Sequence, residues 1–286
     1  MFFSAAFLSG AVTPSVVTFL LGFMSWRMIF VVFGLVGLAW AVAWHRWFRS
    51  EPADHPAVNA AELEYISAGC DRPVHHPAGA RFWRPLLLNR NVAALCLMYF
   101  PNSFAFYFCI TWLPTYLREH HNFNSTSLDF FSGLPLLVSV AGILLGGVVM
   151  DRMTAHFGLR IGRCGVGAAG YLVAAIALLS VPRLGDPVLA ALLVSGAVGA
   201  CMFTLPAAWG SCIDIGGNNS GVVSAAMNTA SQIGSLLCPL IVAYTLKWFG
   251  DWNISIYLMG LMFLGGTICW SVIDPRKRVL AYPGTR

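Results

Sequence analysis

A succession of eight long apolar stretches constrains this chain more than any other feature. A helix needs about 20 mostly apolar residues to cross a hydrocarbon core of ~30 Å, and tilt or local thinning absorbs small mismatches in length. We therefore predict eight transmembrane helices, of which 28–44 and 164–181 are the shortest. The stretches are 2–23, 28–44, 91–117, 130–150, 164–181, 187–213, 221–246 and 254–273.

Composition argues against a soluble globular domain. Charged residues make up 10% and hydrophobic residues 58% of the 286, and the mean hydropathy is +0.72, whereas soluble domains carry about 25% charged residues. So few charges cannot coat a water-exposed surface. A cleavable signal peptide is the alternative for the first stretch, but no basic residue precedes it and no small-residue cleavage site leads into a soluble domain.

The distribution of Lys and Arg predicts the orientation in the membrane. Eight spans place both termini on one side, and thirteen of the 17 Lys and Arg residues fall on that side. Since cytoplasmic loops carry the excess of Lys and Arg, we expect cytoplasmic termini in a multi-pass protein of the bacterial inner membrane. The net charge of +5 then reflects topology, and no nucleic-acid partner is needed. The opposite side holds Arg27, Arg118, Arg183 and Lys247.

The predicted helices form two unequal groups: two helices in residues 1–44, and a six-helix bundle in residues 91–273 followed by a cytoplasmic tail at 274–286. Residues 45–90 are long for a helix connection and are interpreted as a cytoplasmic linker. Within this linker Asn59 stands three residues before Glu62, a capping-box-like start for a short amphipathic helix. We expect this helix on the membrane surface, and a docking site for another protein is the alternative.

Several segments carry a family resemblance. "WRMIFVVFGLVGLAWAVAWHRWFR", "HPAVNAAELEYI" and "NRNVAALCLMYFPNSFAFYFCITWLPTYLREHHNF" resemble the sixth helix, central loop and seventh helix of the anion:cation symporter branch of the major facilitator superfamily. "GGVVMDRMTAHFGLRIGR", "PAAWGSCIDIGGNNSGVVSAAMNTASQIGSLLCPLIVAY" and "WNISIYL" extend the resemblance over nearly the whole chain. It implies an all-α integral membrane fold of the major-facilitator type. Complete members have twelve helices in two bundles and move organic anions, such as sugar acids or aromatic carboxylates, with protons or another cation.

The resemblance also implies that the first four helices of the family are absent, because the first span here is similar to the fifth helix. Those helices form half of the transport cavity and usually carry its anion-binding and proton-coupling groups. Ionisable side chains inside a membrane mark ion or proton pathways, yet none lies in the middle of a span here; Asp129, Asp151 and Asp214 lie near span ends. A missing N-terminal half is therefore a candidate partner, besides the lipid bilayer, the anion and a coupling proton or sodium ion.

Polar side chains share one side of the third span, since they recur every four residues. Hydroxyls and ring edges on this stripe suit a hydroxylated or carboxylated solute, and Pro101 and Pro114 on the same helix could bend it. Helix–helix hydrogen bonding and aromatic packing are the alternative. The stripe consists of Tyr99, Ser103, Tyr107 and Thr111.

The seventh span carries a second polar stripe. Ser224, Asn228, Ser231 and Ser235 fall within about 60° on a helical wheel, with Gln232 beside them. Asn228 both donates and accepts, which suits a carboxylate next to a hydroxyl. The resemblance implies that Asn228 and Trp209 line the transport cavity. A polar seam between helices is the alternative for the stripe, and a core aromatic is the alternative for Trp209.

The segment "GGVVMDRMTAHFGLRIGR" resembles the cytoplasmic-loop signature of the superfamily. The resemblance implies that Asp151 makes charge contacts with the Arg residues of this segment, which form in one conformation and break in the other; Asp151 and Arg152 are the gate candidates, and the other arginines are Arg160 and Arg163. The arginines of this segment also satisfy the positive-inside rule, which explains them without gating. Small residues are expected to allow close helix packing; they are Gly142, Gly146, Gly147, Gly165, Gly167 and Gly170.

The remaining motifs are weak. Eight Cys are scattered without zinc or redox spacing, and the His pairs at 75–76 and 120–121 lack further ligands. We therefore expect no metal, no cofactor and no enzymatic activity. A secondary transporter that works by alternating access is the favoured class, and a non-transporting membrane scaffold or inactive fragment is the second. A membrane-embedded transferase is the third, and it would need catalytic residues that are not apparent.

Overall fold

The structure, a computed structural model, describes residues 2–69, 86 and 88–279. Every regular element within these residues is a helix, which confirms the predicted all-α fold class. The chain divides into two compact units. One contains residues 12–76, and the other contains residues 77–286 together with residues 1–11.

The N-terminal part contains α1 (Phe2–Leu21), α2 (Trp26–Trp47), the short 3₁₀ turn η1 (Pro52–Asp54) and α3 (Ala60–Gly69). Ile29 is the buried side chain of α2, whereas Phe30 is 71% and Trp40 67% exposed. A helix that is apolar on all sides is stable only against lipid or other helices. At 22 residues α2 is longer than the predicted 28–44 and is long enough to cross a membrane.

Helix α3 begins as its sequence predicts. The side-chain oxygen of Asn59 accepts a hydrogen bond of 2.9 Å from the backbone N–H of Glu62, which satisfies one of the donors left open at a helix start. Leu63 and Ile66 are half-buried and the other described side chains of α3 are exposed. The short helix and its cap at Asn59 are thus present where the sequence predicts them. The cytoplasmic linker and the place of this helix on the membrane surface stay predictions.

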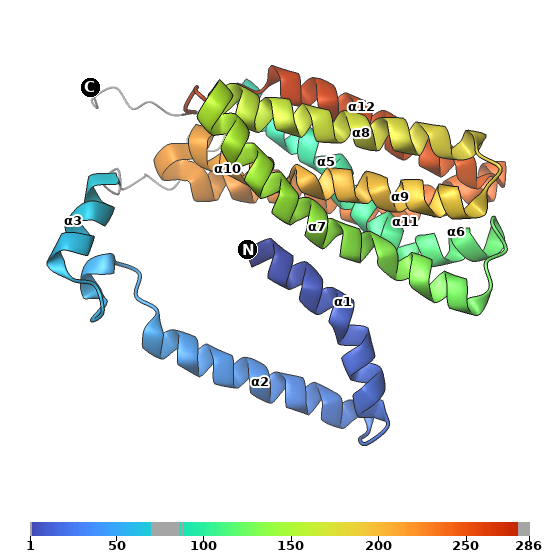
Figure 1. The fold of residues 1–286 in the computed structure, drawn as a ribbon, viewed down its shortest axis with the longest axis horizontal. Helices are drawn as coiled ribbons and strands as arrows, with labels where there is room; N and C mark the ends of the chain where they lie inside the picture. The colour runs from blue at the N-terminus through green and yellow to red at the C-terminus, as the bar shows by residue number, and fades with distance from the viewer. Residues whose placement is uncertain (1, 70–85, 87, 280–286) are drawn as a thin grey trace. The chain divides into compact units, whose positions relative to one another are not determined.

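The larger unit is a helical bundle (Figure 1). Its helices run from α5 after the linker to α12 before the C-terminal tail, with short 3₁₀ or π segments between some of them. They are α5 (Arg90–Thr111), α6 (Leu113–Glu119), α7 (Ser125–Phe157), η2 (Ile161–Gly165), α8 (Val166–Ser180), η3 (Val181–Arg183), α9 (Pro187–Phe203), α10 (Leu205–Gly216), η4 (Gly217–Asn219), α11 (Ser220–Phe249) and α12 (Trp252–Val272).

Helix α5 lies at the centre of this packing. It contacts α11 and α12 extensively, while α7 packs on α9, and α8 packs on both α9 and α12. Aromatic side chains fill the space between α5, α8 and α12: Tyr171 donates a hydrogen bond of 3.0 Å to the carbonyl of Met98, and its ring meets Phe263 edge-on at 5.0 Å. These residues hold α5 in a fixed position, and α5 carries three of the six predicted binding residues.

Six stretches of described helix are long and apolar enough to cross a membrane. Five are α2, α5, α7 from Ser127 onward, Ile161–Arg183 and α12. The sixth, Pro187–Phe249, has 63 residues and contains α9, α10 and α11 in one nearly unbroken run. Since one crossing takes about 20 residues, this run covers two of the eight predicted spans, and the first predicted span falls on α1.

Two predicted spans are divided by proline. The span 91–117 breaks at Trp112, between α5 and α6, and the span 187–213 breaks at Thr204, between α9 and α10. In both cases a Leu-Pro pair opens the second helix, with Pro114 or Pro206 in its first turn. Proline has no backbone N–H, and its ring clashes with the carbonyl four residues earlier, so the helix restarts there. The expectation that Pro101 and Pro114 lie on one helix is therefore wrong.

Glycines allow α7 and α9 to approach closely, as the small residues predict. A Cβ atom on Gly142 would overlap the carbonyl oxygen of Gly199, and one on Gly146 would overlap that of Phe203. Gly147 differs, because the nearest atom to its Cβ would be a Pro206 carbon at 3.9 Å. The close approach thus depends on two positions of the three.

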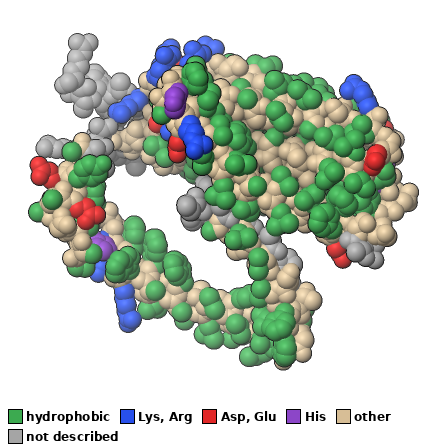
Figure 2. Space-filling model, in the orientation of Figure 1, with side chains coloured by type: hydrophobic (Ala, Val, Ile, Leu, Met, Phe, Trp, Pro, Cys, Tyr) green, Lys and Arg blue, Asp and Glu red, His purple; other side chains and the backbone are tan. Residues whose placement is uncertain are grey.

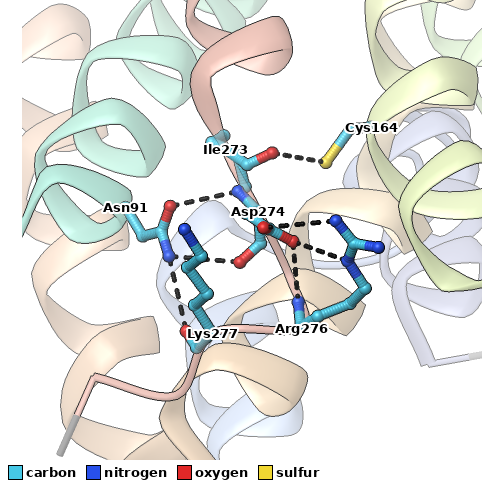
Figure 3. Close-up of polar contacts among 6 residues, drawn as sticks. All are labelled: Asn91, Cys164, Ile273, Asp274, Arg276 and Lys277. Atoms are coloured by element: carbon cyan, nitrogen blue, oxygen red, sulfur yellow. Dashed lines mark hydrogen bonds and ion pairs between the residues drawn. The ribbon is translucent and has the colours of Figure 1, made fainter.

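The segment after α12 is held against one end of the bundle (Figure 3). The side chain of Asn91 at the start of α5 donates to the carbonyls of Asp274 and Lys277 at 3.1 and 3.4 Å and accepts from the Asp274 N–H at 3.0 Å. The Cys164 thiol in η2 reaches the carbonyl of Ile273 at 3.4 Å. The described part of the predicted tail is therefore docked on α5, and the N–H of Val279 also donates to the carbonyl of Ile215 in α10 at 3.0 Å.

Candidate functional site

The polar stripe of α5 changes from buried to exposed along the helix. The side chain of Tyr99 is 5% exposed, Ser103 is half-buried and Tyr107 is 37% exposed. Thr111 is exposed, and its hydroxyl donates to the carbonyl of Tyr107 at 2.7 Å. One end of the stripe therefore belongs to the interior of the bundle, and the other end is open to a solute or to neighbouring helices.

Tyr99 and Trp209 meet between α5 and α10. The indole N–H of Trp209 donates to the Tyr99 hydroxyl at 3.0 Å, and the two rings are nearly perpendicular, with their centroids 6.5 Å apart. Trp209 is half-buried, so part of its ring remains accessible beside the bond. The sequence predicted both residues for the binding site, and the structure brings them together.

Ser103 and Ser231 connect α5 to α11. The Ser103 hydroxyl donates to the Ser231 oxygen at 3.0 Å, and the Ser231 hydroxyl in turn donates to the carbonyl of Asn228 at 3.0 Å. Ser231 is 1% exposed. For these two serines the geometry matches the helix–helix hydrogen bonding that the sequence left open as the alternative.

The amides of α11 lie beside this seam and are exposed. Asn228 and Gln232, one helical turn apart, are both exposed. The side-chain oxygen of Gln232 accepts a bond of 2.9 Å from the Ser235 hydroxyl, which leaves its amide N–H groups to point elsewhere. The six side chains that the sequence predicts for the binding site thus come from α5, α10 and α11. We call this set the polar face: Tyr99, Ser103, Tyr107, Trp209, Asn228 and Gln232.

The predicted gate residues do not pair with each other in this conformation. Asp151 and Arg152 are both exposed near the end of α7, and within the described residues Asp151 forms no ion pair. The role of Asp151 and Arg152 in gating stays a prediction, since it refers to a conformational change.

A different ion pair holds this end of the bundle. Arg163 Nε in η2 lies 2.8 Å from Asp214 Oδ2 in α10, with the two side chains 16% and 21% exposed. Arg163 Nη1 also reaches Met150 Sδ at 2.7 Å. A Cβ on Gly210 would lie 2.6 Å from the Arg163 guanidinium carbon, so the arginine crosses α10 where the helix has no side chain.

Sequence reasoning missed this pair. It interpreted Arg163 as a charge partner of Asp151 or as a positive-inside residue, and it placed Asp214 only near a span end. One signal was present: an acidic residue on the cation-rich side of a membrane protein is not explained by that rule and needs a partner when it is half-buried. Gly210, one turn before Asp214, marked the place where a long side chain could pass.

The described residues contain no cluster of three or more His, Cys, Asp or Glu that could hold a metal ion. His121 instead shares a hydrogen bond of 2.9 Å with the Tyr116 hydroxyl. The described cysteines are not joined in disulfides. The His pair at 75–76 and Cys70 lie outside the described residues.

Comparison with known proteins places these features in a family context. A family model described as Major Facilitator Superfamily matches residues 1–237. A probable sulfoacetate transporter of Cupriavidus necator is 29% identical over 95% of this chain and 63% of its own length. A probable L-galactonate transporter of Escherichia coli K12 is 26% identical, over 96% and 62%. A D-galactonate transporter of Escherichia coli O6:H1 is 24% identical, over 90% and 61%.

The chain thus spans less than two thirds of the length of these curated relatives. All three carry names of transporters, in agreement with the sequence evidence against an enzyme, and each name specifies an organic anion.

Proposed function

Because the chain belongs to the Major Facilitator Superfamily, whose model matches residues 1–237, we propose that it forms the larger part of a secondary transporter for a small organic anion. A sugar acid or an aromatic carboxylate is the substrate class. A proton or a sodium ion is the coupling cation, and the two bundles of the complete transporter rock about a central site to give alternating access. The names of the relatives support an organic anion.

The observation that carries this proposal is the polar face of α5, α10 and α11. It combines the 3.0 Å hydrogen bond between the Trp209 indole and the Tyr99 hydroxyl with two exposed amide side chains one turn apart on α11. Amide N–H groups donate to a carboxylate, amide oxygens accept from hydroxyls, and an indole ring stacks on the apolar face of a sugar or on an aromatic ring. These groups together match a molecule that bears a carboxylate and either hydroxyls or a ring.

The polar face offers only neutral groups. The six residues that form it are aromatic, hydroxyl or amide residues, so they leave the negative charge of the substrate uncompensated. We propose that a cation from the rest of the transporter balances it, either in a longer form of this chain or in a separate N-terminal half. The coupling ion would be bound there as well.

We further propose that both termini face the cytoplasm of the bacterial inner membrane, so that residues 1–44 contribute two spans, 45–90 a cytoplasmic linker, 91–273 a six-helix bundle and 274–286 a tail. The excess of Lys and Arg on one side supports this orientation. On that side Asp151 and Arg152 would make contacts that form in only one of the two transport conformations.

Uptake into vesicles tests the proposal. Radiolabelled sugar acids and aromatic carboxylates would be offered both to this chain and to a version extended upstream to any in-frame start. We expect saturable uptake that a proton or sodium gradient drives. Asn228→Ala and Trp209→Ala should raise the substrate concentration needed for half-maximal uptake.

Uptake by the extended form alone would support a transporter whose cavity needs additional helices. Uptake by neither form, with correctly inserted protein and the full substrate panel, would favour the non-transporting scaffold instead. Uptake that is insensitive to every ion gradient would contradict the coupled mechanism.

A further inference from the structure

A groove of about 560 Å³ lies at the end of the bundle where α7 and α8 meet α12, and none of the polar-face residues lines it. The end of α7, the π turn η2, the start of α8, the end of α12 and the following segment form its walls. Its lining combines two arginines, Arg160 and Arg276, with apolar side chains that include Phe157, Ile161 and Trp270.

The cations of this groove outnumber its anions. Arg276 Nε lies 3.0 Å from Asp274 Oδ1 (Figure 3), and the Arg276 side chain is still 59% exposed. Arg160 is exposed and forms no ion pair within the described residues. Figure 2 shows Lys and Arg side chains gathered at this end of the bundle. Asp274 is thus ion-paired with Arg276, while Arg160 has no carboxylate partner within the described residues, so the groove retains a net positive charge.

The position of Arg276 is fixed by the docked segment. Asn91 binds the backbone of Asp274 on both its N–H and its carbonyl, and Asp274 in turn accepts from the backbone N–H of Arg276 at 3.3 Å. The guanidinium is thus held at the rim of the groove. A group that is already ordered loses less conformational entropy when it binds an anion.

The apolar part of the groove is open to the outside. Phe157 is 61% and Ile161 47% exposed, and candidate membrane spans end at Phe157, begin at Ile161 and end at Val272. The groove therefore lies where three spans meet the membrane surface, at the level of the lipid phosphates. A free anion would need only the arginines, whereas a phospholipid also explains the exposed apolar side chains next to them.

We propose that this groove binds the headgroup of an anionic phospholipid. Arg160 and Arg276 contact the phosphate, and Phe157 and Ile161 contact the first carbons of the acyl chains. Basic pockets between transmembrane helices on the cytoplasmic side are suited to such lipids. The site is independent of the proposed transport function.

Native mass spectrometry of the chain, reconstituted with defined lipids and then extracted in mild detergent, tests this site. We expect phosphatidylglycerol to be retained in preference to phosphatidylcholine. Each basic residue near the headgroups contributes roughly 1 kcal/mol, so Arg160→Gln and Arg276→Gln should each weaken phosphatidylglycerol binding about fivefold. Arg152→Gln is the matched control: it removes the same charge from the same end of the bundle, but Arg152 does not line the groove, and binding should change little.

Three results would overturn the proposal. They are equal retention of the two lipids by the unmodified chain, a preference that persists in the double variant Arg160→Gln/Arg276→Gln, and displacement by inorganic phosphate as effective as displacement by phosphatidylglycerol. The last result would indicate a site for free anions. If the double Gln variant does not fold, Arg160→Lys/Arg276→Lys replaces it. This variant keeps the charge, and loss of the lipid preference in it while the helical circular dichroism is unchanged would contradict binding through charge.

Discussion

The indole N–H of Trp209 in α10 donates a hydrogen bond of 3.0 Å to the hydroxyl of Tyr99 in α5, although the two residues are 110 positions apart in the chain. Tyr99 is buried and Trp209 is half-buried, so the bond lies at the border between the interior of the bundle and its polar face. A substrate that stacked on Trp209 would therefore contact a ring whose orientation is fixed by its hydrogen bond to the buried Tyr99.

Trp209→Phe and Tyr99→Phe each remove one partner of this bond and keep an aromatic ring. Each should lower the free energy of unfolding by about 1 kcal/mol, and the double variant should lose less than the sum of the two, because both changes remove the same bond. Chemical unfolding in detergent, followed by circular dichroism, measures the coupling. Additive losses would show that the bond contributes nothing.

Ser103 and Asn228 should behave differently although the sequence suggested both for the site. Ser103→Ala breaks the hydroxyl chain to Ser231 and should cost about 0.6 kcal/mol of stability, with little effect on substrate affinity. Asn228→Ala removes an exposed amide and should leave stability nearly unchanged while it weakens substrate binding about tenfold, the loss of a hydrogen bond to a charged group. Unfolding and uptake measured on both variants decide this. The opposite pattern would assign Ser103 to the binding site.

These differences indicate what local sequence patterns reveal. The 3.6-residue period identifies which side chains share a helix face, and the N-cap at Asn59 follows from a motif of a few residues, so both were predictable. Whether a polar side chain of such a face bonds another helix or stays exposed depends on the neighbouring helix. The bond from Ser103 to Ser231 joins positions 128 residues apart, and no local pattern encodes it.

The breaks at Trp112 and Thr204 were predictable in principle. Pro114 and Pro206 lie inside apolar runs of membrane-spanning length. Each run was therefore predicted as one continuous span, although proline breaks a helix. The Arg163–Asp214 pair depends on η2 and α10 lying side by side and on Gly210 making room between them. The sequence interpretation therefore connected Arg163 with Asp151 or with topology, and it left Asp214 without a role.

Gly146→Ala and Gly147→Ala form a matched pair on α7. At Gly146 the added methyl group would overlap the backbone of Phe203, whereas at Gly147 the nearest atom is 3.9 Å away. We expect Gly146→Ala to destabilise the bundle by about 1–3 kcal/mol through overpacking, and Gly147→Ala to be neutral or slightly stabilising because Ala favours the helix. Thermal unfolding in detergent compares them. Equal effects would mean that α7 and α9 are not in close contact.

His121 should make stability depend on pH. Burial, and to a lesser extent the neighbouring His120, lowers the pKa of His121 below its usual value, and its ring is hydrogen-bonded to Tyr116. The unfolded chain therefore binds a proton at a higher pH than the folded chain does. The free energy of unfolding should fall as the pH drops from the ordinary His pKa of about 6.5 through the lower folded value.

His121→Gln should remove this part of the pH dependence, while His120→Gln should keep most of it. Unfolding curves from pH 5 to 8 provide the comparison. A pH profile that is the same in the unmodified chain and in His121→Gln would show that His121 does not carry the effect.

Arg163 and Gly210 should be strongly coupled, because the guanidinium occupies the space that a side chain at position 210 would need. In the unmodified chain Gly210→Ala forces Arg163 away from Asp214 and should cost about 1–3 kcal/mol. In an Arg163→Ala background the same substitution meets no guanidinium and should be neutral or slightly stabilising, since Ala is the better helix former. Arg163→Ala is itself expected to destabilise, because it leaves Asp214 half-buried without its cation.

A double-mutant cycle measured by chemical unfolding in detergent gives the coupling directly. Asp214→Asn is the control that separates charge from packing, because it removes the ion pair but leaves the guanidinium over α10. If Gly210→Ala costs the same with and without Arg163, the arginine does not cross α10 at this glycine, and the ion pair with Asp214 must be reached along another path.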